Sequence, residues 1–178
     1  RITLINSIHG GALLVREAQV RGSAIDSVNS SLGGYGVYVI LPTDPDEDSK
    51  MTLFGDTVDI STGGTVSSFG LNIGNGLYEL SPIDETKSVT TLPGGYTITK
   101  ICVGQSPSTC STVASTSLTI SFTRPSPLPS IYLNDSKTTN YSKACLEMES
   151  PRAPKAGHTR SLEVYSSGMI RTLLTGCS

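Results

Sequence analysis

The chain has 178 residues, which is enough for one domain with a hydrophobic core. Its formal net charge is −2 and only 16% of its residues are charged, so composition does not favour binding to nucleic acid or to an anionic membrane. Apolar residues make up 37% of the chain, which excludes general disorder, and abundant Ser and Thr without any Trp are typical of a secreted or surface-displayed β-rich domain.

The N-terminal part of the chain carries the spacing of an amphipathic helix. Between Ile2 and Val28 the apolar residues recur mostly every third or fourth position, at Ile5, Ile8, Ala12, Val15, Ala18, Ile25 and Val28. This period places them along one stripe of an α-helix. We therefore expect a helix over residues 1–31, with a weak point at Gly10 and Gly11, that packs Val15, Ala18, Ile25 and Val28 on a β-sheet.

Residues 32–178 show short apolar or alternating runs, which is the pattern of β-strands. The segment Tyr35–Leu41 (YGVYVIL) is a clear example. Turn residues at Pro93–Gly95 and Ser166–Gly168 each separate two such runs and predict hairpin loops. Strands are expected at 36–41, 51–54, 77–80, 88–92, 96–103, 117–122, 130–133, 144–148, 160–165 and 169–174, and the long segment 56–76 has room for another around 65–69.

Together these patterns predict an α+β fold. Residues 1–31 would form a long N-terminal helix packed on the antiparallel sheet or sheets of one β-rich head domain, residues 32–178. The unbroken apolar runs are far shorter than the roughly 20 residues that cross a bilayer. Because the helical pattern is already under way at Arg1, we expect a further segment upstream.

The cysteines are Cys102, Cys110, Cys145 and Cys177. An even number in a chain rich in Ser and Thr indicates two disulfides and an oxidising compartment, and three pairings are possible. The closely spaced Cys pairs with supporting His that a zinc site requires are missing from the sequence. We expect the pairs Cys102–Cys110 and Cys145–Cys177, because they are nearest in sequence and join the ends of predicted strands.

The acidic segment Asp44–Asp48 (DPDED) is the obvious candidate for a metal site. A calcium loop requires alternating oxygen ligands, a Gly at its sharp turn and a late bidentate Glu, whereas this segment has a Pro and no Gly. It is therefore expected to be a solvated turn, and Asp56 and Asp59 are expected to be turn residues as well. His9 and His158 stand in no recognisable catalytic motif. The sequence thus predicts no metal, no cofactor and no enzymatic activity.

Two arginines suggest a contact with nucleic acid. Arg160 and Arg171 flank the predicted hairpin at Ser166–Gly168 and would contact phosphates if they lay on one face. The cations of this region are scattered among acidic residues, so the alternative is that they are solvated charges at strand edges. The alternative is the simpler explanation.

Several short segments, taken in order, resemble type IV pilin-like proteins. The segment Ala12–Gln19 (ALLVREAQ) resembles the helix of bacterial pilins and pseudopilins. Tyr35–Val39 followed by Leu53–Asp56 resembles the first sheet of minor pseudopilins, and Leu118–Pro125 followed by Leu162–Arg171 resembles the closing strands of the GspH/FimT group. The hydrophobic N-terminal helix that defines this family is not in the chain.

The resemblance implies a pilin-like fold and a structural role. The chain would be a minor pilin of a type IV pilus or a pseudopilin of a type II secretion system. It would be anchored in the inner membrane by an upstream segment, with a periplasmic or extracellular head, and would join other subunits through its N-terminal helix. One alternative is a binding module, namely a DNA-uptake minor pilin or a surface adhesin. Another is a phage or secreted β-domain whose helix is a trimerisation stalk.

Overall fold

The computed structural model describes residues 2–24, 33–44, 47–57, 75–80, 84–92, 96–104, 109–123, 126–150 and 158–177. One helix, α1 (Ile2–Ser23), comes first in this part of the chain, and strands follow it. The strands are β1 (Gly34–Ile40), β2 (Lys50–Asp56), β3 (Thr86–Thr91), β4 (Thr97–Val103), β5 (Thr109–Ser111), β6 (Ser117–Thr123), β7 (Ser130–Leu133), β8 (Lys143–Glu149), β9 (Thr159–Tyr165) and β10 (Ile170–Leu173).

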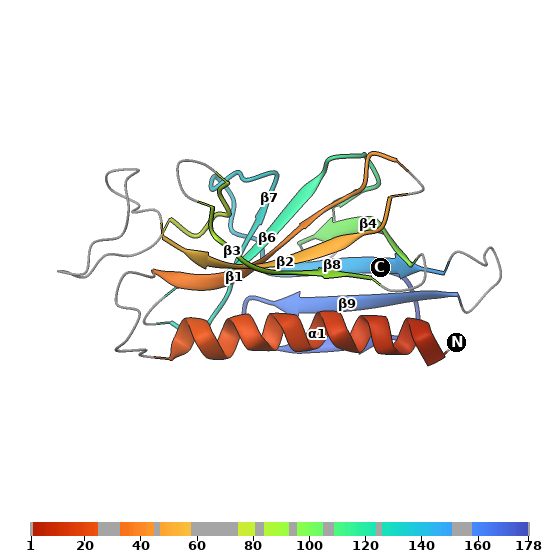
Figure 1. The fold of residues 1–178 in the computed structure, drawn as a ribbon, viewed down its shortest axis with the longest axis horizontal. Helices are drawn as coiled ribbons and strands as arrows, with labels where there is room; N and C mark the ends of the chain where they lie inside the picture. Colours follow the sequence, from red (N-terminus) through yellow and green to blue (C-terminus); the bar gives the residue numbers. More distant parts are fainter. Residues whose placement is uncertain are drawn as a thin grey trace.

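The strands form two antiparallel sheets of five strands each (Figure 1). Sheet 1 has the order β3-β2-β1-β6-β7, and sheet 2 has the order β10-β9-β8-β4-β5. The central pair of sheet 1, β1 and β6, runs from Gly34 opposite Thr123 to Ile40 opposite Ser117. The chain enters sheet 2 with β4 and β5, returns to sheet 1 with β6 and β7, and ends in sheet 2.

This architecture shows that the predicted α+β fold, a long helix on a sheet, is wrong. The described chain is mostly β, because one helix of 22 residues accompanies two five-stranded sheets. Helical spacing reports which face of a segment is buried, but it does not report how many layers of sheet the rest of the chain forms. The helix ends at Ser23, and the predicted helical positions Ile25 and Val28 lie outside the described residues.

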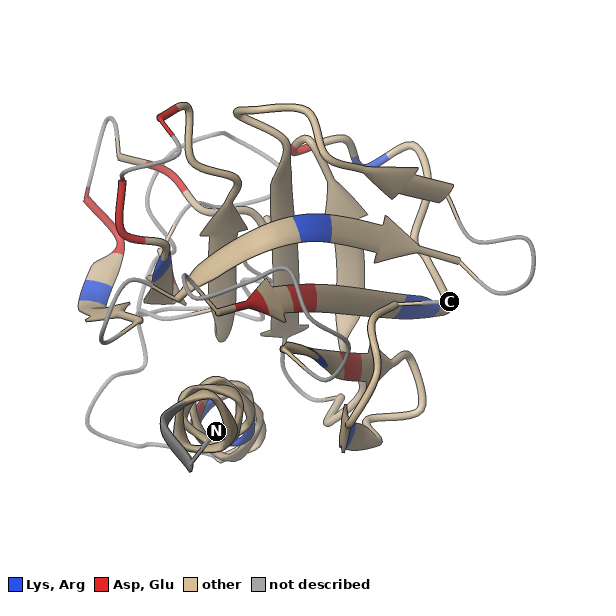
Figure 2. Ribbon diagram, turned by 90° about the vertical axis from the view of Figure 1, so that its right-hand side faces the viewer, with Lys and Arg blue, Asp and Glu red and all other residues tan. Residues whose placement is uncertain are grey.

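The helix lies along one side of the two sheets and contacts strands of both (Figures 1 and 2). Val15 and Ala18 are 0% exposed, as the helical stripe predicts. Gly11 leaves room for Met51 of sheet 1 and Met148 of sheet 2, since a Cβ there would lie 3.1 and 3.4 Å from their side chains. The helix and the inner faces of both sheets thus share one hydrophobic core.

The turns show where local patterns are informative. Ser166–Gly168 joins β9 to β10 as predicted, with Gly168 at a φ of 83°. Pro93–Gly95 lie outside the described residues, but the strands on either side do not form the predicted hairpin, because β3 pairs with β2 in sheet 1 whereas β4 pairs with β5 and β8 in sheet 2. Residues 77–80 are not a strand, β5 was not predicted, and 65–69 lie outside the described residues.

Among the described residues, no helix is both long and apolar enough to span a membrane.

Candidate functional sites

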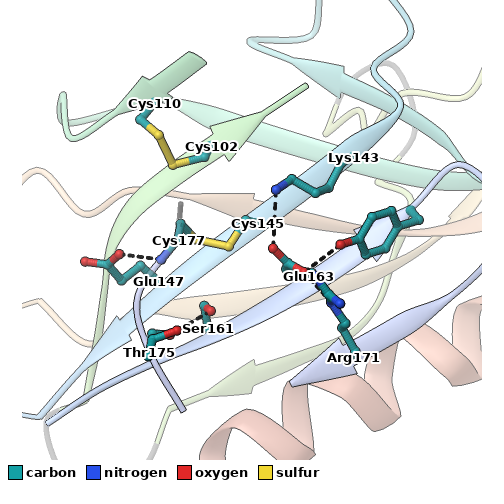
Figure 3. A network of polar contacts seen from close by, with 11 residues as sticks. Cys102, Cys110, Lys143, Cys145, Glu147, Ser161, Glu163, Arg171, Thr175 and Cys177 are labelled. Carbon is teal, nitrogen blue, oxygen red and sulfur yellow. Dashed lines mark hydrogen bonds and ion pairs between the residues drawn. A yellow bond between two sulfur atoms is a disulfide. The ribbon is translucent and has the colours of Figure 1, made fainter. Parts of the chain in front are cut away.

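Both predicted disulfides are confirmed, and they lie on one face of sheet 2. The pairs are Cys102–Cys110 and Cys145–Cys177 (Figure 3). In the register of the sheet, Cys110, Cys102, Cys145, Glu163 and Arg171 stand directly opposite one another across all five strands. Residues in one such row point to the same face. The neighbours of these residues along β8 and β9, such as Leu146 and Leu162, belong to the core, so the row lies on the outer face.

A charged network occupies the outer face of sheet 2 at Glu163. This carboxylate is 1% exposed and accepts hydrogen bonds from Tyr165 Oη at 2.8 Å, Arg171 Nε at 2.5 Å and Lys143 Nζ at 3.3 Å. Burial alone would raise the pKa of Glu163, but the bonds from Tyr165, Arg171 and Lys143 together outweigh it and hold the pKa below its usual value. Glu163 is therefore a buried anion with a full set of donors.

The C-terminal segment covers part of this face and is fastened at several points (Figure 3). Ser161 Oγ donates to Thr175 O at 2.8 Å, and Cys177 N donates to Glu147 Oε2 at 2.8 Å. Glu147 also forms an ion pair with Lys100, with 2.8 Å between Nζ and Oε2. Together with the Cys145–Cys177 disulfide, these contacts give the outer face of sheet 2 a cover of its own.

Arg160 and Arg171 do not share a face. Residues 160, 162 and 164 alternate with 161, 163 and 165 along β9, and Arg171 stands opposite Glu163. Arg160 is 4% exposed, and its Nη1 donates to the carbonyl oxygens of Thr159 at 2.8 Å and Leu174 at 2.9 Å. Arg160 therefore binds backbone carbonyl groups of its own chain, and the geometry does not support the predicted joint contact with phosphates.

The other sequence candidates are dispersed. Asp44 and Asp48 are exposed at the turn between β1 and β2, and His9 is exposed on α1. His158 comes just before β9, whereas Asp59 lies outside the described residues. Within the described ranges, no group of three or more His, Cys, Asp or Glu side chains is arranged to hold a metal ion.

Asp56 is not the solvated turn residue that its sequence context suggests. It ends β2, is fully buried, and accepts hydrogen bonds from the backbone N–H of Asn75 at 3.1 Å and of Gly76 at 2.6 Å. Glu79 and Glu85 complete a cluster of carboxylates with it. Sequence reasoning missed this cluster because Glu79 and Glu85 stand more than twenty residues from Asp56 in an irregular segment.

The outward face of α1 carries large apolar side chains. Leu13 and Val20 are each 66% exposed and lie seven residues apart, which places them on the same side of the helix. A groove beside Leu13 runs between α1 and the edge strand β10, where Ala12 and Arg16 face Ile170 and Thr172.

Comparisons of the chain with protein-family models, curated proteins and solved structures found no match. The family is therefore not shown, and the resemblance to pilins and pseudopilins remains a prediction.

Proposed function

We propose that the chain is a structural subunit of an exported assembly, namely a minor pilin of a type IV pilus or a pseudopilin of a type II secretion system. The proposal includes an anchor in the inner membrane, upstream of α1, and a head in the periplasm or outside the cell. It does not depend on the α+β fold class, which the two-sheet architecture has replaced.

The two faces of α1 are the observation that carries this proposal. One face is buried, with Ile8, Val15 and Ala18 between 0 and 2% exposed. The opposite face exposes Leu13 and Val20, which gain stability only if another surface covers them. A helix that is buried on one side and exposes Leu13 and Val20 on the other fits between its own sheets and a neighbouring subunit.

The disulfides support the same compartment. Cys102–Cys110 and Cys145–Cys177 require oxidising conditions to form and persist, as outside the bacterial cytoplasm. The second of them fastens the C-terminal segment, so part of the outer face of sheet 2 stays covered in a head that lies outside the cytoplasm.

A site-specific photo-crosslink tests the proposal. The protein is produced in its native host from its own gene, with a photoreactive phenylalanine analogue in place of Leu13 or Val20. The matched control is Val113, which is 68% exposed on the segment between β5 and β6. We expect crosslinks to pilus or pseudopilus subunits, identified by mass spectrometry, from the helix positions and not from Val113.

Two outcomes would contradict a subunit role. One is an absence of crosslinks from both helix positions in cells that assemble the filament. The other is a soluble fraction that contains the protein in full, with no share in any assembly. Either result would leave the exposed side chains of α1 as ordinary surface residues.

A further inference from the structure

A short segment covers the outer face of sheet 1. We call residues 75–80 the strap. The ring of Tyr78 in the strap lies 4.8 Å from the ring of Tyr38 on β1 and 5.6 Å from the ring of Phe54 on β2, measured between centroids. Gly36 makes this aromatic patch possible, because a Cβ at that position would lie 2.4 Å from Phe54 Cζ. The strap therefore packs on apolar rings of the outer face of sheet 1.

Carboxylates hold the strap in place. Asp56 accepts the N–H groups of Asn75 and Gly76 at the start of the strap. Glu85 accepts the N–H of Glu79 at 2.9 Å with Oε2, and it accepts the N–H of Thr57 at 2.6 Å with Oε1. The backbone of the strap is thus tied at both ends to side chains that are 0% exposed.

Glu79 is the weak member of this cluster. Its Oε1 accepts a hydrogen bond from Asn75 Nδ2, but its Oε2 is buried and finds no donor among the described residues. The Glu79 and Glu85 carboxyl groups also lie beside each other, because Glu85 Oε2 accepts the backbone N–H of Glu79. Two carboxylates so placed repel each other, so the pair is stable when it shares a proton.

The charges around the cluster are mostly negative. Asp56 comes from β2, Glu85 from the residues before β3 and Glu79 from the strap, while Lys137 acts on Asp56 only as a nearby charge. The Tyr78 hydroxyl is shared with Thr86 Oγ1 at 2.7 Å. Burial, together with the neighbouring Glu85, raises the pKa of Asp56 to about 7, against the bonds from Gly76 and Asn75.

The same causes act on Glu79. Burial first, and then the hydrogen bond and charge of Glu85, raise the pKa of Glu79 to about 7. A carboxyl whose pKa is raised in the folded state stabilises that state below its unfolded pKa, near 4.3, and the contribution is lost as pH rises through the folded pKa. The contacts of the strap therefore weaken between about pH 4 and 7, in step with loss of the shared proton.

A second observation concerns a buried hydroxyl under the strap. Gly76 has a φ of +78°, and a Cβ there would lie 3.1 Å from Ser121 Oγ on β6. Ser121 is 1% exposed, and its hydroxyl oxygen finds no hydrogen-bond partner in the described part of the chain. An unpaired buried hydroxyl is unfavourable, and lifting the strap would let water reach it.

We propose that the strap is a pH-dependent flap, fastened to sheet 1 by the proton that Glu79 and Glu85 share and released from the aromatic patch of Tyr38 and Phe54 when that proton is lost. Release exposes Tyr38, Phe54 and Tyr78 on one face. The device needs no ligand other than the proton. It is also independent of α1, so it stands or falls separately from the proposed assembly role.

Glu79→Gln is the test variant. The Gln side chain keeps an oxygen for Asn75 Nδ2 and gives Glu85 a permanent N–H donor, so the strap should stay closed at every pH. The readout is hydrogen exchange by mass spectrometry in peptides that contain 75–80, with wild type and variant compared at the same pH so that intrinsic exchange rates cancel. Peptides from β6 report whether the sheet itself is intact.

We expect equal protection of the strap in wild type and variant at pH 5. At pH 8 we expect exchange of the strap to be at least tenfold faster in wild type than in Glu79→Gln. The largest effect possible is roughly 300-fold, because the pKa of Glu79 falls from about 7 in the closed strap to 4.5 in the open one. Glu47→Gln, at an exposed carboxylate beside Lys50, is the matched control and should behave as wild type.

Equal exchange in wild type and Glu79→Gln at both pH values would overturn the proposal. So would protection of the wild-type strap at pH 8 by millimolar Ca²⁺, because the cluster would then hold a cation rather than a proton. If Glu79→Gln fails to fold, as exchange in β6 would show, Glu79→Ala replaces it. That variant removes the shared proton and should open the strap equally at pH 5 and pH 8, and a closed, pH-sensitive strap in it would refute the proposal.

Discussion

The same substitution at two glycines of α1 should have opposite effects on stability. A Cβ at Gly22 would lie 2.5 Å from the backbone oxygen of Phe122 on β6 and 2.7 Å from its Cβ, so the end of the helix and the strand would have to separate. A Cβ at Gly10 would meet nothing within 4 Å. Gly10→Ala therefore changes only the helical propensity, whereas Gly22→Ala also disturbs the packing of helix on sheet.

The magnitudes follow from these environments. Gly10→Ala should raise the free energy of unfolding by about 1 kcal/mol, since Ala favours a helix interior over Gly by that amount. Gly22→Ala gains less, because it is at the end of the helix, and overpacking against a backbone atom costs about 1–3 kcal/mol. We expect a net loss of about 1–2 kcal/mol at Gly22.

Thermal and urea unfolding followed by circular dichroism would measure both effects. For a chain of this size, 1 kcal/mol corresponds to roughly 2–4 °C in Tm. The reasoning would be refuted if Gly22→Ala raised the Tm as much as Gly10→Ala does, because the close approach of α1 to β6 would then be absent. An unchanged m-value is required for the comparison to report stability alone.

Three further predictions concern the outer face of sheet 2 and the helix surface. Glu163→Gln should lower the free energy of unfolding by about 2–3 kcal/mol at pH 7. The difference from wild type should shrink as pH falls from about 4.5 through the lowered pKa, since the stabilisation requires an ionised carboxyl, and an undiminished difference at the lowest pH at which both proteins fold would contradict this. Replacing Cys145 and Cys177 together by Ser should lower the free energy of unfolding, measured in urea, by about 3–4 kcal/mol, because their disulfide closes a loop of 32 residues. A loss under about 1 kcal/mol would contradict this stabilising role. Leu13→Lys with Val20→Lys should leave the Tm within about 2 °C of wild type yet abolish assembly in the native host, and a normal filament would contradict the role of α1.

Local pattern was sufficient for the elements that depend on one periodicity. The buried stripe through Val15 and Ala18, the alternation in β1 and β6, and the hairpin at Ser166–Gly168 follow from spacing and turn chemistry within a few residues. The Cys102–Cys110 pair could be predicted because the two residues are eight apart in sequence and stand opposite each other on β4 and β5. Each of these features needs only short-range information.

Features that depend on distant contacts could not be predicted. The segment Pro93–Gly95, which lies outside the described residues, has the composition of a hairpin turn, but β3 and β4 belong to different sheets, and no local signal reports that change. Arg160 has the spacing of a strand-edge cation, yet its side chain is buried and donates a hydrogen bond to the carbonyl oxygen of Leu174, fourteen residues away. Asp56 resembles a turn residue until the strap covers it. In each case the partner of the residue or strand comes from a distant part of the chain.

The buried Glu163 and the half-buried Glu79 show how neighbours decide what burial does to a carboxyl pKa. Glu163 has three donors and remains ionised, whereas Glu79 has one donor, an oxygen that finds no donor among the described residues and a second carboxyl beside it, so it keeps a proton to about pH 7. Stability should therefore fall in acid as Glu163 loses its charge and fall again as Glu79 gains one. We expect the Tm to be highest near pH 4 and to fall between there and about pH 7, and we expect Glu79→Gln to make that fall shallower, with the remainder due to Asp56. Profiles of Tm against pH for both proteins would check this, and an unchanged alkaline limb in Glu79→Gln would show that another group titrates there.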